Sequence, residues 1–103
     1  MTQAQETHYR KLVDLEKTLK LMERVARNER INIDQFTTIY NTIVERGVGH
    51  RCNMKNVGNV QTTSWLGWMA YDDSYGLRIA YTDYDGARWV ILKYNDENRL
   101  IRL

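Results

Sequence analysis

The sequence contains no proline and a single cysteine, Cys52. Without a second cysteine the chain cannot form an internal disulfide, and without proline it holds no rigid proline-rich linker. No apolar run approaches the roughly 20 residues that a membrane-crossing helix needs. The first residues also lack the apolar segment of a secretory signal. We therefore expect a cytoplasmic protein that does not act at a membrane.

An excess of charge of one sign is also missing. Residues 1–49 carry eight Lys or Arg and seven Asp or Glu, and residues 50–103 carry seven and six, so each half has a net charge of +1. A strong non-specific nucleic-acid binder usually concentrates basic residues in one patch, and a DNA mimic needs a large negative excess. The sequence disfavours both classes.

Residues that perform chemistry are few. His8 and His50 are the two histidines, and Cys52 follows the second without any C-x-x-C or H-x-x-x-H spacing that would indicate a metal site. A D-x-D-G fragment begins at Asp83, but Tyr94 stands where a calcium loop of the EF-hand type needs glutamate. We expect no catalytic residues, no metal and no cofactor, and hence no enzyme.

Bulky apolar residues are plentiful. Seven tyrosines, three tryptophans and one phenylalanine supply enough volume for a packed core, and 103 residues is an ordinary size for one domain. We predict a single domain over residues 1–103, with helices in residues 1–47 and a sheet in residues 48–103.

A long helix is predicted over residues 4–28. Its apolar residues alternate at spacings of three and four, which is a heptad seam about two heptads long: Leu12, Leu15, Leu19, Met22 and Ala26. Two interpretations of this seam are open: that it packs on the rest of the same chain, or that part of it forms a dimer interface.

A second helix is predicted to begin after Asn32 and to end near Arg46. Asn32 followed three residues later by Gln35 fits a capping box. Gly47 suits the end of the helix. Because only a few residues separate the two helices, they should form an antiparallel hairpin.

The rest of the chain is predicted to form about four antiparallel strands, which gives an α+β fold. Residues 47–60 hold three glycines and three asparagines and are interpreted as a loop or an irregular edge strand. β-branched and aromatic residues predict four strands after that segment, over residues 62–71, 77–84, 87–94 and 99–103.

The strongest turn signal is Asp85-Gly86 between two alternating runs, which predicts a two-residue type I′ hairpin. Its register assigns one face to the core: Leu77, Ile79, Tyr81, Val90, Leu92 and Tyr94. The opposite face mixes apolar and basic residues: Arg78, Ala80, Thr82, Trp89, Ile91 and Lys93. A four-residue connection before the last strand would add Leu100 and Arg102 to that second face.

The second face is too apolar for an ordinary solvated surface. Three interpretations are open: a second subunit or a loop of the chain covers it, a partner protein binds it, or aromatic and basic side chains hold a nucleotide. Trp65 and Trp68 are three residues apart, so on one strand they lie on opposite faces and one of them is an exposed anchor. The candidate binding residues are Trp65, Trp68, Tyr71, Arg78, Trp89, Lys93 and Arg102.

The sequence therefore predicts a small, non-enzymatic, homo-oligomeric interaction protein. A compact binder of this size is typical of inhibitors that phages and mobile elements carry, which bind and block a host macromolecule. The alternative is a small-ligand binder that sequesters a nucleotide between aromatic and basic side chains.

Overall fold

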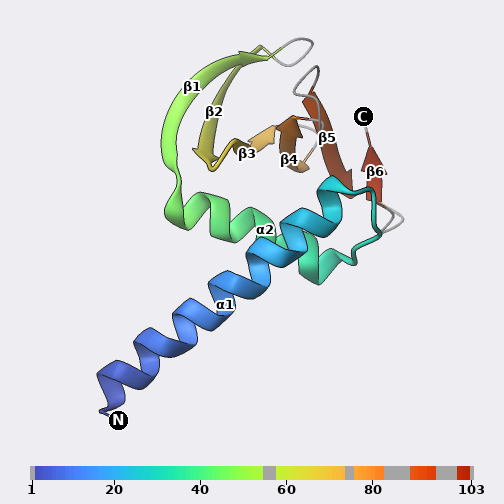
Figure 1. Cartoon of the computed structure of the whole chain (residues 1–103). Coiled ribbons are helices and arrows are strands. Elements are labelled where there is room, and N and C mark those ends of the chain that lie inside the picture. Colours follow the sequence, from blue (N-terminus) through green and yellow to red (C-terminus); the bar gives the residue numbers. More distant parts are fainter. Residues whose placement is uncertain (1, 55–57, 74–75, 83–88, 95–99, 103) are drawn as a thin grey trace.

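The computed structural model describes residues 2–54, 58–73, 76–82, 89–94 and 100–102 (Figure 1). Two helices precede a sheet of six antiparallel strands in the simple order β1-β2-β3-β4-β5-β6, so the α+β fold is confirmed. The elements are α1 (Gln3–Ala26), α2 (Ile33–Arg46), β1 (Val48–Met54), β2 (Gly58–Trp65), β3 (Trp68–Asp73), β4 (Gly76–Thr82), β5 (Trp89–Tyr94) and β6 (Leu100–Arg102).

Side chains cap both helices at their first turns. In α2 the predicted capping box is present. The backbone N–H of Gln35 donates to Asn32 Oδ1 at 2.9 Å, and the backbone N–H of Asn32 donates to Gln35 Oε1 at 2.9 Å. Thr2 and Gln5 form the same reciprocal pair at the start of α1. At the end of α1, Asn28 adopts the left-handed conformation (φ 66°), and asparagine tolerates this conformation better than most residues. Both helices thus begin where the local sequence dictates.

The sheet has two more strands than the sequence predicts. Val48–Met54 forms β1 at the edge of the sheet, which agrees with the second of the two expectations, a loop or an irregular edge strand. It pairs with β2, with Cys52 opposite Val60. The described side chains of β1 are exposed or half-buried, so this strand carries no apolar alternation for sequence analysis to detect. The second extra strand arises because the expected strand over residues 62–71 is divided by a turn at Leu66-Gly67.

The register between β4 and β5 is the predicted one. Tyr81 pairs with Val90 and Ile79 pairs with Leu92. The Asp85-Gly86 turn itself lies outside the described residues. Alternation along these two strands was therefore sufficient to predict which side chains share a face.

The register of the last strand differs from the prediction. Tyr94 pairs with Leu100, so the connection is one residue longer than expected. A shift of one residue moves every position to the other face of a strand. Position 102 consequently lies opposite Leu92, on the core face, and the expectation that Arg102 belongs to the second face is wrong.

One face of the sheet packs against the helices and forms the main core. Tyr81 connects the two layers, because its hydroxyl donates a hydrogen bond of 3.2 Å to the backbone oxygen of Val25 in α1. Among the predicted core-face residues whose side chains are described, Leu77 is 41% exposed and Val90 is half-buried, and the others are buried. The buried residues of the main core are Met22, Val25, Ile31, Phe36, Ile39, Ile43, Ala70, Ile79, Tyr81 and Leu92.

The centre of the second face is also buried within this single chain, whereas Thr82 on the same face is exposed. The buried residues form a smaller cluster of their own: Val60, Met69, Tyr71 and Ala80. The strands follow an arc, and α2 lies along the outer side of that arc against β2, β3 and β4 (Figure 1). The second face is the inner, concave one, so curvature of the sheet supplies the cover that the sequence analysis sought in a second subunit or a ligand.

Tyr40 of α2 is expected to make stability fall at high pH. Burial raises the pKa of its phenol above the ordinary value of 10.0, and the Asp72 carboxylate raises it further. The folded state therefore holds the proton more tightly than the unfolded chain does. This contribution is fully present below about pH 10 and is lost as pH rises through the raised pKa. Urea melts above pH 10 should show a shallower decline for Tyr40→Phe, and parallel declines would contradict this assignment.

Candidate functional site

The candidate binding residues do not share one accessible surface. Tyr71 and Arg78 lie on the concave face and are only 1% and 7% exposed, and Lys93 of the same face is half-buried. The side chains of Trp89 and Arg102 lie outside the described part of the structure. Tyr71 and Arg78 are therefore interior residues of this face, and whether any of the candidate residues contacts a ligand stays a prediction.

Two candidate residues are brought together. Trp65 at the end of β2 pairs directly with Trp68 at the start of β3, so both lie on the helix-covered face and the prediction of opposite faces is wrong. The reason is that the chain reverses between them instead of continuing as one strand. Both rings are half-buried against the main core, and Trp68 stacks on Tyr81 with ring centroids 4.5 Å apart.

The turn between the two tryptophans has an unusual residue in it. Leu66 and Gly67 both have positive φ, 51° and 81°, which is the pattern of a type I′ turn. Asparagine, aspartate or glycine normally occupies the first position, and a residue such as leucine costs roughly 1–2 kcal/mol there. The Leu66 side chain is 66% exposed, so little burial offsets this strain. Neither turn chemistry nor packing explains the leucine.

A second exposed apolar side chain lies at the same end of the sheet. Val48, at the start of β1, is 74% exposed and pairs with Ser64, two residues before Leu66. Val48 shares the face of Ser64, however, and the two tryptophans lie on the other face of the sheet. We therefore call the set Trp65, Leu66 and Trp68 the hairpin-tip surface. The tryptophans were predicted as anchors because Trp is enriched at binding hot spots. Leu66 was missed, and the available signal was an apolar residue placed before Gly67.

A different exposed surface is formed by the first half of α1. Every described residue from Thr2 to Leu12 is exposed, and the helix extends beyond the rest of the chain (Figure 1). The radius of gyration is 14.7 Å, against about 13 Å for a compact chain of this size. In the predicted heptad seam Met22 is buried, but Leu12 is 50% and Leu19 36% exposed. Of the five seam residues the chain buries only Met22, since Leu15 is half-buried and Ala26 is exposed like Leu12 and Leu19.

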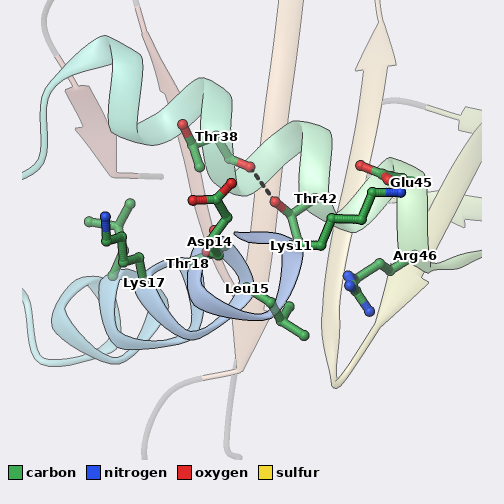
Figure 2. Close-up of a pocket in the computed structure, with 10 residues that line it drawn as sticks. Lys11, Asp14, Leu15, Lys17, Thr18, Thr38, Thr42, Glu45 and Arg46 are labelled. Atoms are coloured by element: carbon green, nitrogen blue, oxygen red, sulfur yellow. Dashed lines mark hydrogen bonds between the residues drawn. The ribbon is translucent and has the colours of Figure 1, made fainter. Parts of the chain in front are cut away.

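A groove of about 560 Å³ lies where α1 diverges from α2 (Figure 2). Charges of both signs line it, including Lys11 and Asp14 from α1 and Glu45 from α2. Its threonine hydroxyls are used locally, since Thr18 donates to the Asp14 backbone oxygen at 3.0 Å and Thr42 donates to that of Thr38 at 2.8 Å. The charges that line the groove are of both signs, and its hydrogen-bond donors do not converge on one point. Its lining therefore does not indicate a small-ligand site.

Comparisons with known proteins do not place the chain in a family. No family model, no curated protein and no solved structure matches it.

The described residues were also searched for metal ligands and membrane spans. Within them, no group of three or more His, Cys, Asp or Glu side chains is arranged to hold a metal ion. His50 and Cys52 lie two residues apart in β1, and the His50 ring Nδ1 is 3.4 Å from the backbone oxygen of Val48. No helix in the described ranges is long and apolar enough to cross a membrane. The hairpin-tip surface and the projecting half of α1 remain as the candidates for function.

Proposed function

We propose that this protein is a non-enzymatic interaction protein that binds another protein through its hairpin-tip surface. The observation that carries the proposal is Leu66, an exposed apolar residue held in a strained turn between two tryptophans. Strained backbone at an exposed position costs stability, and such strain is concentrated at binding and active sites. Docking into an apolar pocket of a partner would bury Leu66 and explain its presence.

The composition of the surface favours a protein over a nucleic acid. None of its three side chains is charged, whereas phosphate groups would call for Lys or Arg. Tryptophans around an apolar centre are typical of protein hot spots. The tip is also rigidly supported, because Trp68 stacks on Tyr81 and Tyr81 is hydrogen-bonded to Val25. A pre-organised contact loses little conformational entropy on binding.

The nucleotide alternative is not favoured by any observation in the described residues. It requires a base to stack on an aromatic ring beside an accessible cation. Of the cations that were expected beside Trp89, Arg78 is only 7% exposed and Lys93 is half-buried, and the Trp89 side chain lies outside the described part of the structure. We therefore do not pursue that alternative.

The wider proposal keeps the expectation from the sequence that the protein is cytoplasmic and inhibits a host macromolecule by occupying one of its surfaces. Phage and mobile-element inhibitors act in this way. Its support is the small size of the chain, the scarcity of catalytic motifs in the sequence and the apolar tip.

Leu66→Asn is the variant that tests this proposal. Asparagine suits the first position of a type I′ turn, so the free energy of unfolding should rise by about 1 kcal/mol. Binding should weaken at least about tenfold, because the apolar anchor is lost. Immobilised protein would capture partners from a bacterial lysate, and the captured protein would then be titrated against both forms.

Leu77→Ala serves as the matched control, since Leu77 is another exposed leucine of the same sheet but lies away from the tip. It should leave binding unchanged. The proposal would be overturned if Leu66→Asn destabilised the fold, because Leu66 would then have a structural role. Equal affinity of the captured protein for the wild type and Leu66→Asn would also overturn it.

A further inference from the structure

We infer that the seam of α1 formed by Leu12, Leu15 and Leu19 is a self-association surface, and that its occupant is the α1 helix of a second copy of this chain, aligned in parallel. This goes beyond the proposed function, because it uses a different element and a different set of side chains. The seam consists of Leu12, Leu15 and Leu19, of which Leu12 is 50% and Leu19 36% exposed while Leu15 is half-buried.

The first observation is the length of helix that has little support from the rest of the chain. Before Thr18, no described residue of α1 is buried. Isolated helices shorter than roughly 12–15 residues are marginal in water, because most helical stability in proteins comes from packing an apolar face. A helix of 24 residues is about 36 Å long, so much of α1 extends past its contacts with α2. This half of α1 needs a partner surface to be stable.

The second observation is the spacing of the seam. Leu12 and Leu19 are seven residues apart, and Leu15 lies between them at the intermediate position, so they occupy the a and d positions of a heptad. A 3.5-residue repeat keeps one stripe facing a partner helix with the same repeat. The α1 helix of a second copy has the same sequence and therefore the same repeat.

The third observation is the charge beside the seam, which selects the parallel arrangement. With Leu12 at position a, Lys11 occupies position g and Glu16 occupies position e of the same helix. In a parallel pair, g of one helix faces e of the next heptad in the other, so Lys11 faces Glu16 of the second copy, twice by symmetry. In an antiparallel pair the e positions of the two helices face each other. Glu16 and Glu23 of one copy would then lie near Glu16 and Glu23 of the other, and their like charges would repel.

The charges of the arm also favour a second copy over a membrane. A helix that lies on an anionic membrane presents a polar face rich in Lys and Arg. The arm instead interleaves both signs, with Glu6, Asp14 and Glu16 among its basic residues. The free seam is short, so association should depend on concentration in the micromolar range.

The primary test is the mass of the full chain in solution over a concentration series, by analytical ultracentrifugation. Wild type should shift from 12.3 kDa toward twice that mass. Leu12→Glu combined with Leu19→Glu should raise the dimer dissociation constant about tenfold or more. Val44→Glu is the matched control, since Val44 is an exposed apolar residue of α2 outside the seam. Val44→Glu and Leu66→Asn should both dimerise as wild type does, which separates this inference from the hairpin tip.

The orientation is tested by cross-linking in a Cys52→Ser background, which removes the native thiol. Leu12→Cys at position a should give a covalent dimer under copper-phenanthroline oxidation, because equivalent a positions of parallel helices lie within disulfide distance. Lys17→Cys, at position f on the side of α1 away from the seam, should not. A chain that stays at 12.3 kDa at every concentration would overturn the inference. So would a dimer that tolerates the double glutamate variant, or one that Leu12→Cys fails to cross-link.

Discussion

Replacing Ile79 with alanine is expected to lower the free energy of unfolding by about 2–5 kcal/mol. Ile79 is fully buried in the main core and pairs with Ala70 on one side and Leu92 on the other. Removal of its branched side chain would leave a cavity between the central strands and the helices, and the sheet on both sides restricts collapse into that space. Urea unfolding followed by tryptophan fluorescence measures the loss.

Leu77→Ala is the matched control for this prediction. Leu77 lies two residues earlier in the same strand but is 41% exposed, so its truncation should cost less than about 1 kcal/mol. Equal losses for the two variants would show that the main core is not centred on Ile79.

Gly47→Ala is expected to destabilise the protein by about 1–3 kcal/mol or more. A Cβ atom at this position would lie only 2.6 Å from the backbone oxygens of Ile43 and Ser64 and from the methyl group of Thr63. Two of these three atoms belong to the backbone, so the last turn of α2 and strand β2 would have to separate. The φ of Gly47 is −84°, which any residue adopts, so the requirement is one of space and not of conformation.

Gly49→Ala, two residues later in β1, provides the comparison. Its Cβ would meet only the end of the Gln61 side chain at 3.3 Å and a backbone oxygen at 3.9 Å. Glycine weakens a strand, so this change should be neutral or slightly stabilising. Thermal melts of the two variants side by side decide the matter. If Gly47→Ala had the same melting temperature as the wild type, the junction between α2 and β2 could open without loss of stability, and the prediction would be wrong.

Local features of the sequence were sufficient for much of the fold. Asn32 and Gln35 predicted the start of α2 because their hydrogen bonds involve neighbouring residues only. The alternation in residues 77–94 predicted the register of β4 and β5, because the period of a strand depends on backbone geometry alone. Part of the candidate site could also be predicted from the sequence, because Trp65 and Trp68 were selected for their residue type.

The remainder depended on the arrangement of elements in space. Leu66-Gly67 forms a turn that leucine does not signal, so the two tryptophans were assigned to opposite faces and the exposed Leu66 was overlooked. The mixed character of the second face left open whether a subunit, a loop, a partner protein or a nucleotide covers it, and only the structure shows that Arg78 and Ala80 are buried within the chain. Curvature arises from the twist of six paired strands together, and no single stretch of sequence encodes it. The chain's own alternation determined which residues share a face, and only the curved sheet decided which face is open to solvent.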